Sequence, residues 1–278
     1  AIISVIINHF NKDILPNGYL GVDIFFVLSG YVICSSISRR KSKNFREFIT
    51  SFYARRIKRL IPALVFFVLS VSLIICLFSP NTFGQINTGI SALFGVSNIS
   101  LFWKSKDYFS ELMSLNPFTH TWSLGVEEQF YFLLPFLAWI SGFARGKKNS
   151  EKIFFLIIFI TSILSFFLFA KLYSTNQPAA YFLMPMRLWE MGAGCIVFLI
   201  SRKNINFTEN ILLIKPLIIL FLILIIMFSN LNPVISTFGV VFLASYILLT
   251  LKKGTFLYTI LTKELVVFVG LISYSLYL

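Results

Sequence analysis

Long apolar runs separated by short polar or basic loops are the dominant pattern of this chain. Seven of the runs contain about twenty residues, the length that crosses the ~30 Å hydrocarbon core of a bilayer as a helix. They lie at 18–38, 60–79, 122–143, 153–173, 181–200, 211–229 and 234–251, and shorter runs lie at both ends, at 1–11 and 265–278. The pattern predicts an all-α fold, a polytopic transmembrane bundle of about nine to ten spans with the terminal ones incomplete.

The composition agrees with a membrane location. Hydrophobic residues make up 57% of the chain, charged residues 13%, and 33 residues are Phe, which is more apolar surface than a water-soluble core of this size hides. No internal repeat and no soluble domain is visible, so residues 1–278 are expected to form a single membrane domain. The three cysteines lie in apolar runs without a CxxC pattern, so we expect small core residues and neither a disulfide nor a metal site.

Basic loops predict the orientation of the chain, because Lys and Arg in short loops mark the cytoplasmic side. The loop 39–59 contains nine of them: Arg39, Arg40, Lys41, Lys43, Arg46, Arg55, Arg56, Lys58 and Arg59. The span 18–38 must therefore run inward and the first helix outward, which places His9 in the outer half of the membrane.

A second basic loop, 144–152, is also expected in the cytoplasm. If both 86–103 and 122–143 crossed the membrane, that loop would lie outside. We therefore predict that 86–103 is re-entrant or interfacial and that 80–121, which includes a turn at 79–82, is largely extracytoplasmic.

The net charge of +13 arises from 24 Lys and Arg against 11 Asp and Glu. Most of the basic residues fall in the loops assigned to the cytoplasmic face, where anionic lipid headgroups account for them. Membrane lipid is therefore the expected partner of this charge, and nucleic acid is not.

Ionisable residues inside apolar runs are costly and normally face a functional cavity. The candidates are His9, Asp23, Glu127, Glu128, Arg187 and Glu190. By the predicted topology all of them lie in the outer half of the membrane, which indicates one polar chamber beneath the outer surface.

His9 has two interpretations. A lone histidine in an apolar helix is often held in place by a hydrogen bond and does nothing more. Alternatively, Asp13 lies four residues further on and would share a helical face with His9. A carboxylate there would orient the ring and raise its basicity for general-base work, unless Asp13 is simply a solvated loop residue.

The other candidates also have structural interpretations. Asp23 suits a helix N-terminus, where negative charge is stabilised by ~0.3–1 kcal/mol. Arg187 and Glu190 have the i, i+3 spacing of a pair. Glu127 and the adjacent Glu128 point about 100° apart on a helix, so at most one readily shares a cavity with His9.

Three arginines precede the run at 60–79, and Arg55 and Arg59 share a helical face beside Arg56. The planar guanidinium fork suits phosphate oxygens. Topology anchoring and contact with lipid headgroups explain such clusters equally well.

Taken together, the motifs of this chain resemble the acyltransferase 3 family, bacterial integral-membrane O-acyltransferases that acetylate surface polysaccharides. Six ordered blocks carry the resemblance: I-I-N-H-F at 6–10, G-Y-L-G-V-D-I-F-F-V-L-S-G-Y at 18–31, F-Y-A-R-R-I-K-R-L-I-P at 52–62, N-P-F-T-H-T-W-S-L-G-V-E-E-Q-F-Y at 116–131, M-R-L-W-E-M-G-A-G at 186–194 and G-L-I-S-Y-S-L-Y-L at 270–278. They cover essentially the whole chain, and their order makes the set far more specific than any single block.

The resemblance implies a multi-pass protein of the bacterial inner membrane that takes an acyl group, most simply acetyl, from cytoplasmic acetyl-CoA. The acceptor would be a hydroxyl of a surface glycan or its lipid-linked precursor. The resemblance also implies catalytic roles for His9 and Glu127 and a role in acyl-CoA binding for the arginines Arg55, Arg56 and Arg59. Asp23 is predicted as a third catalytic residue, which shapes the chamber, and Asp13, Arg187 and Glu190 as supporting residues.

These residues leave two chemistries, one rival class and an inactive scaffold within an envelope assembly as alternatives. His9 either removes the proton of the attacking hydroxyl or forms an acetylated intermediate. The rival is a proton-coupled secondary transporter, which also uses buried carboxylates and histidine. Transporters favour inverted repeats, and no repeat is visible here.

Overall fold

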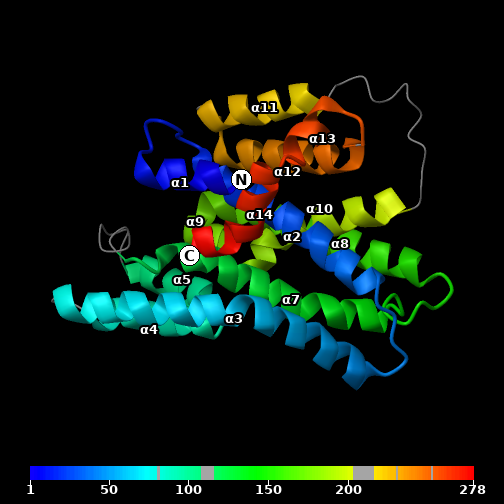
Figure 1. Ribbon diagram of the computed structural model, residues 1–278, viewed down its shortest axis with the longest axis horizontal. Helices are drawn as coiled ribbons and strands as arrows, with labels where there is room; N and C mark the ends of the chain where they lie inside the picture. Colours follow the sequence, from blue (N-terminus) through cyan, green and yellow to red (C-terminus); the bar gives the residue numbers. More distant parts are fainter. Residues whose placement is uncertain (80–81, 108–115, 203–215, 230, 252) are drawn as a thin grey trace. The chain divides into compact units, whose positions relative to one another are not determined.

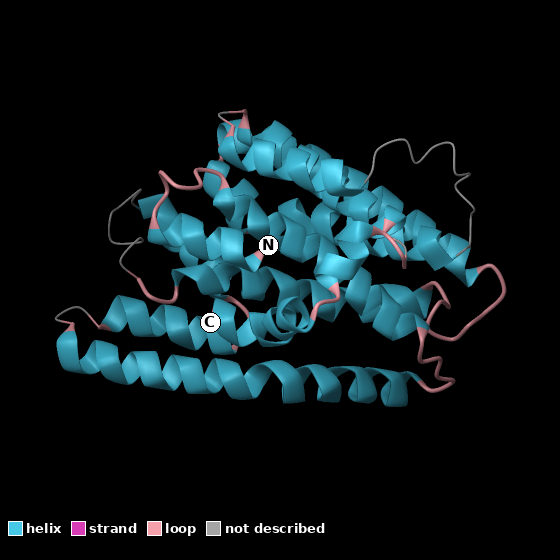
Figure 2. Cartoon of the chain, turned by 45° about the horizontal axis from the view of Figure 1, so that its top comes forward, coloured by secondary structure: helices cyan, strands magenta, loops and turns pink. Residues whose placement is uncertain are grey.

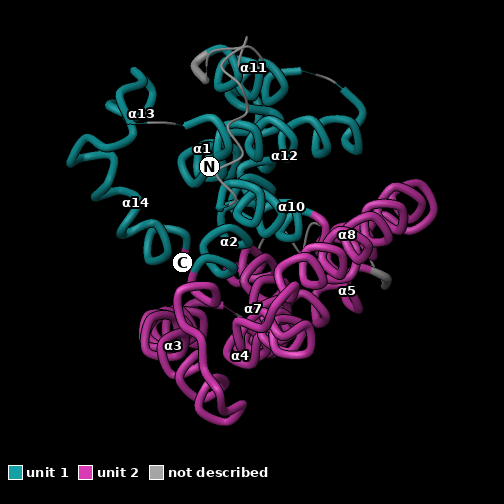
Figure 3. The backbone as a smooth tube through the Cα atoms, turned by 90° about the vertical axis from the view of Figure 1, so that its right-hand side faces the viewer, with its two compact units in different colours: residues 1–35, 190–277 teal, residues 36–189, 278 magenta. Residues whose placement is uncertain are grey.

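The computed structural model describes the chain except residues 80–81, 108–115, 203–215, 230 and 252, drawn in grey in Figure 1. Helices connected by turns and loops make up the described residues, and no strand occurs among them (Figure 2). The all-α prediction is confirmed. The chain divides into two compact units, residues 1–35 with 190–277 (unit 1) and residues 36–189 with Leu278 (unit 2), coloured separately in Figure 3.

Unit 1 is built from both ends of the sequence. Its elements are α1 (Ile2–Phe10), η1 (Gly18–Leu20), most of α2 (Gly21–Ser38), most of α10 (Met184–Arg202), α11 (Pro216–Phe228), α12 (Pro233–Thr250), α13 (Phe256–Leu261) and α14 (Glu264–Tyr277). Unit 2 contains α3 (Phe45–Phe78), α4 (Phe83–Leu93), α5 (Ser97–Asp107), η2 (Thr119–Thr121), α7 (Trp122–Ile140), α8 (Ser150–Thr175) and α9 (Gln177–Phe182).

Five helical segments are long and apolar enough to cross a membrane: Gly18–Ser38, Phe45–Phe78, Ser150–Thr175, Gln177–Arg202 and Pro233–Thr250. Helices also occupy the other predicted runs, but α7, α11 and α14 are not among these five. The prediction of nine to ten spans is therefore not confirmed. The first residues of the run 211–229 lie outside the described part of the chain.

In unit 1, helices α2 and α10 touch backbone to backbone through glycine. A Cβ atom added to Gly30 would overlap the carbonyl oxygen of Met191, and one added to Gly194 would overlap that of Val27. The thiol of Cys195 donates a hydrogen bond to the Gly30 carbonyl oxygen at 3.2 Å. Small residues of this kind allow membrane helices to approach closely, so the glycines fix the contact between these two helices.

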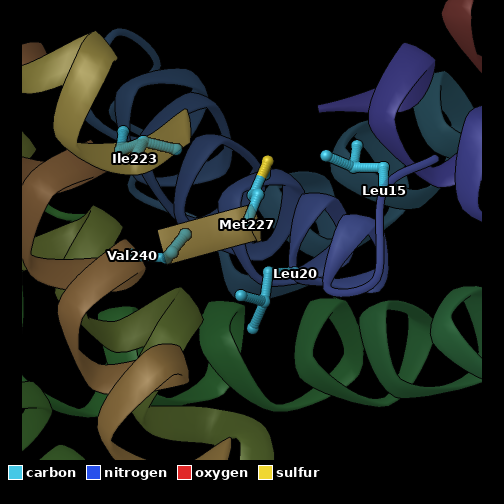
Figure 4. Packing of buried hydrophobic residues seen from close by; sticks show 5 residues of the cluster. All are labelled: Leu15, Leu20, Ile223, Met227 and Val240. Atoms are coloured by element: carbon cyan, nitrogen blue, oxygen red, sulfur yellow. The ribbon is translucent and has the colours of Figure 1, made fainter. Parts of the chain in front are cut away.

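Buried side chains join the loop after α1 to helices α11 and α12. Leu15, Leu20, Ile223, Met227 and Val240 form a hydrophobic cluster within unit 1 (Figure 4). The backbone N–H of Asn17 donates to the Met227 carbonyl at 3.0 Å. The loop thus meets the C-terminal end of α11, and the topology predicted above places both on the outer side.

Cysteine positions agree with the sequence analysis only in part. Cys34 and Cys195 are fully buried in unit 1, as predicted for small core residues. Cys76 is exposed on α3, so its assignment to the core was wrong.

Helix α3 is longer than the predicted span. Its 34 residues correspond to about 51 Å, well above the ~30 Å of hydrocarbon. The segment 45–59, expected as part of a loop, is helical, and the side chain of Asn44 caps its start by accepting from the Arg46 N–H at 3.0 Å. The arginine cluster therefore lies on a continuous helix that leads into the apolar run.

The two basic loops of unit 2 lie beside each other. The Ser42 N–H donates to the Ala144 carbonyl at 3.2 Å, and the side chain of Lys41 packs against Gly146, which has a φ of +67°. In Figure 1 the start of α3 accordingly lies next to the connection between α7 and α8. This contact supports the prediction that both loops lie on one membrane face.

Two short helices replace a single span at 86–103. Helices α4 and α5 have 11 residues each, about 16 Å, which is too short to cross a bilayer. Asn98 of α5 and Gln129 of α7 are joined by hydrogen bonds in both directions, of 2.8 and 3.3 Å. These lengths are compatible with a re-entrant or interfacial segment, which stays a prediction, and residues 80–81 of the expected turn lie outside the described chain.

Candidate active site

His9 lies in the last turn of α1 and its side chain is exposed. Its Nδ1 atom is 2.9 Å from the carbonyl oxygen of Val5. A carbonyl oxygen only accepts hydrogen bonds, so Nδ1 carries the proton in this arrangement. In the neutral ring Nε2 then keeps its lone pair, which is the atom that a general base or a nucleophile uses.

Asp13 does not share a helical face with His9, contrary to the prediction. Helix α1 ends at Phe10, and Asn11 has extended backbone angles. The Asn11 side chain accepts a hydrogen bond from the Asp13 N–H at 2.8 Å, a local turn that competes with helix. The group that orients the His9 ring is thus the Val5 carbonyl, and Asp13 is an exposed loop residue.

Asn8, which the sequence analysis did not select, holds α1 to the loop that follows it. Its side chain is 6% exposed and its Nδ2 donates to the carbonyls of Leu15 and Pro16 at 2.8 and 3.0 Å. These bonds satisfy two backbone acceptors and fix the loop next to the histidine.

Asp23 and Glu190 are buried carboxylates of unit 1, with 2% and 0% of their surface exposed. Asp23 lies in the first turn of α2, the position at which the helix dipole favours a negative charge. Glu190 lies on α10. Both interact with other residues of the protein.

Unit 1 also contains an apolar cavity of about 400 Å³. Its lining comes from α1, α2, α11, α12 and α13, and nearly all of it is aliphatic; Ser4 is its polar residue and donates its hydroxyl to the Ala1 carbonyl. His9 and Asp23 are not part of this lining. The cavity is therefore not the predicted polar chamber.

The arginine cluster occupies one stretch of α3 in unit 2. Arg55 and Arg56 are partly buried and Arg59 is exposed. Arg55 is close enough to Arg40 and Arg56 to be repelled by their charges. A bound anion relieves such repulsion, and the guanidinium fork matches phosphate oxygens.

Glu127 is linked to this cluster through Tyr131. The Tyr131 hydroxyl donates to Glu127 Oε1 at 3.1 Å, and the guanidinium carbon of Arg56 lies 4.5 Å from the centre of the Tyr131 ring. Both Glu127 and Tyr131 are buried in α7. The adjacent Glu128 attracts Arg56 electrostatically, so the two carboxylates have different neighbours, as their 100° separation predicts.

Arg187 is buried among aromatic rings. Its guanidinium carbon lies 5.2 to 5.6 Å from the ring centres of Trp122, Phe169 and Tyr181, and its Nε donates to the Tyr181 carbonyl at 3.2 Å. Trp122, which lies in the sequence block 116–131, thus forms one side of the aromatic surroundings of Arg187. The predicted pairing of Arg187 with Glu190 stays a prediction.

The structure brings some of the predicted site residues together. Arg56 and Glu127 are joined by Tyr131 within unit 2. His9 and Asp23 belong to unit 1, and the polar chamber expected to contain His9 and Glu127 stays a prediction. Among the described residues no three His, Cys, Asp or Glu side chains are grouped as metal ligands.

A family model described as "Acyltransferase domain" matches residues 1–278. The chain belongs to the acyltransferase 3 family. With five helices long and apolar enough to cross a bilayer, this member of the family is a membrane protein. The membership favours an acyltransferase over the transporter alternative.

Curated relatives carry related names. The chain is 33% identical to the O-acetyltransferase OatA of Staphylococcus aureus (strain NCTC 8325 / PS 47) over 198 residues, which are 71% of this chain and 32% of that protein. It is 32% identical over its full length to the "Putative O-acetyltransferase SACOL0978" of S. aureus (strain COL), and the match covers 48% of that protein. The matches thus cover about a third and about half of the length of these relatives. No solved structure matches it.

Proposed function

We propose that the protein is an O-acyltransferase of the bacterial inner membrane that moves an acyl group, most simply acetyl, from cytoplasmic acyl-CoA to a hydroxyl group. The acceptor is a surface glycan or its lipid-linked precursor. Family membership and the names of the relatives support the class of reaction. The observation that carries the mechanism is the bond from His9 Nδ1 to the Val5 carbonyl, because in the neutral ring it assigns the proton to Nδ1 and the lone pair to Nε2.

In the proposed reaction, Nε2 of His9 accepts the proton of the acceptor hydroxyl while that oxygen attacks the thioester carbonyl carbon. The carbon–sulfur bond breaks, and the CoA thiolate leaves and takes the proton from the imidazolium. The products are the O-acyl ester and CoA thiol. General-base catalysis of this kind contributes ~10²–10⁴-fold to the rate.

The donor is proposed to bind at the arginine cluster of α3. CoA carries several phosphate groups, and Arg55 and Arg56 supply a concentration of positive charge on a helix that continues into the apolar run. Arg59, one turn beyond Arg55, extends the cluster along the same face. Phosphates bound there would leave the thin pantetheine arm to carry the thioester toward the membrane.

A direct test uses membranes from cells that express the protein, incubated with acetyl-CoA labelled in the acetyl group. Label is expected in extracted glycan or lipid-linked sugar from these membranes, but not from membranes with His9→Ala. A normal rate of transfer by His9→Ala would show that His9 takes no part in the reaction. Mass spectrometry of His9 peptides after a brief reaction without acceptor separates the two chemistries, since only the nucleophilic route leaves acetyl on the ring.

A further inference from the structure

Tyr131 is a buried residue of α7 that contacts one residue of the proposed catalytic set and one residue of the proposed donor site. Its side chain is 5% exposed. Its hydroxyl bonds to Glu127, the proposed catalytic carboxylate, and its ring lies under Arg56, a member of the proposed donor site. We propose that Tyr131 is a positioning residue that holds Glu127 as an ionised acceptor and couples it to the donor-binding arginines.

The helix geometry explains the first contact. Glu127 and Tyr131 are four residues apart on α7 and therefore lie on the same face. A phenolic O–H that donates to a carboxylate favours its charged form, and a bond to a charged group is stronger than one between neutral groups. The 3.1 Å bond thus holds Glu127 Oε1 in place and favours the charged form of the carboxyl group.

The second contact joins α7 to α3. The 4.5 Å separation between the Arg56 guanidinium and the ring centre is within the ~6 Å limit for a cation–π interaction. The same guanidinium is attracted by Glu128. Arg56 therefore packs against α7, and an anion bound to Arg56 would act on the ring whose hydroxyl holds Glu127.

The proposal rests on the proposed function for its kinetic test. Tyr131→Phe keeps the ring over which Arg56 lies and removes the hydroxyl, so kcat is expected to fall about 10-fold or more while KM for acetyl-CoA stays within about twofold. Tyr131→Leu removes the ring as well, so KM for acetyl-CoA is also expected to rise, by roughly 2- to 30-fold for a lost cation–π contact. A side chain that only stabilises the fold would lower the amount of protein in both variants. It would not lower kcat in one variant and raise KM only in the other.

Tyr173→Phe is the matched control. The Tyr173 hydroxyl accepts a hydrogen bond from Gln177 at 3.2 Å in an exposed position. Its removal is expected to leave kcat and KM unchanged.

A double variant tests the order of the two residues. Tyr131→Phe should not lower kcat further once Glu127→Gln is present, because the hydroxyl acts through that carboxylate. Additive losses would contradict the proposal.

A second measurement does not depend on activity. Dicyclohexylcarbodiimide modifies protonated carboxyl groups in membranes, and peptide mass spectrometry distinguishes Glu127 from Glu128. Tyr131→Phe is expected to increase modification of Glu127 several-fold, with Glu128 unchanged as the internal standard. Equal modification of Glu127 in the variant and the parent protein would overturn the proposal. If the parent protein transfers no acetyl group, the proposed function fails, and the carbodiimide result still decides whether Tyr131 holds Glu127.

Discussion

His9 and Glu127 are held in opposite ways. The His9 ring is exposed and is oriented by a backbone carbonyl of its own helix. Glu127 is 6% exposed and is oriented by Tyr131, a side chain that also contacts α3. A backbone acceptor cannot be removed by a substitution, whereas a side-chain donor can.

This difference determines which neighbours matter to each residue. The orientation of His9 depends on the path of α1 and on the loop that Asn8 fastens to it. The orientation of Glu127 depends on a chain of side chains from two helices. Substitutions around His9 should therefore act through the stability of the backbone, and substitutions around Glu127 should act through charge.

The largest expected effect is that of His9 itself. His9→Ala removes the proposed base, so transfer of labelled acetyl is expected to fall by ~10²–10⁴-fold. His9→Gln retains a polar side chain, but its amide nitrogen cannot serve as a base. The rate of acetyl transfer by this variant should fall by a similar factor. The amount of each variant in the membrane provides the control, and a His9→Gln enzyme with near-normal kcat would show that His9 only holds structure.

Glu127→Gln is expected to have the next largest effect. It keeps the shape of the side chain and an acceptor for the Tyr131 hydroxyl but loses the charge, and the loss of a charge-assisted bond predicts about a 10- to 100-fold lower kcat. Glu128→Gln is the adjacent comparison and should lower kcat less, since Glu128 faces Arg56. Equal losses in both variants would contradict separate roles for the two carboxylates.

Asn8→Ala tests whether the backbone around His9 is held in place by the side chain of Asn8. It leaves the carbonyls of Leu15 and Pro16 without their side-chain donor, which is expected to lower the free energy of unfolding by about 1–3 kcal/mol. Activity should fall only several-fold, because the bond between His9 and Val5 remains. Thermal unfolding in detergent measures the first quantity, and Lys12→Ala, at an exposed position of the same loop, should change stability by no more than about 0.5 kcal/mol.

Much of the fold follows from the sequence because apolar length acts locally. Each apolar run contains a helix in the described part of the chain, and Gly18, Gly21 and Gly30 lie at close helix contacts as their small size allows. The two basic loops lie beside each other, as expected of loops predicted on the same membrane face. The predicted number of spans was not confirmed, because α7, α11 and α14 are not among the helices that are both long and apolar enough to cross a membrane.

Less of the candidate site could be predicted from the sequence. The spacing of Glu127 and Tyr131 is visible in the sequence as i, i+4 and could have identified the tyrosine. The contact of Tyr131 with Arg56 could not be read in this way, because it joins segments 75 residues apart. The pairing of Asp13 with His9 was wrong because a helix period was extended past Phe10, where the Asn11 side chain closes a turn.

The smallest expected effect is that of Asp13→Asn, and it decides between the two accounts of His9. Asp13 is exposed and lies outside α1, while the Val5 carbonyl already fixes Nδ1. Removing the charge should therefore change kcat by less than about twofold, the scale of an exposed substitution away from special contacts. The measurement is the rate of acetyl transfer across pH, with Asn8→Ala as the comparison on the other side of the turn. A loss in Asp13→Asn as large as that in Asn8→Ala would mean that a carboxylate, and not the peptide carbonyl, orients the His9 ring.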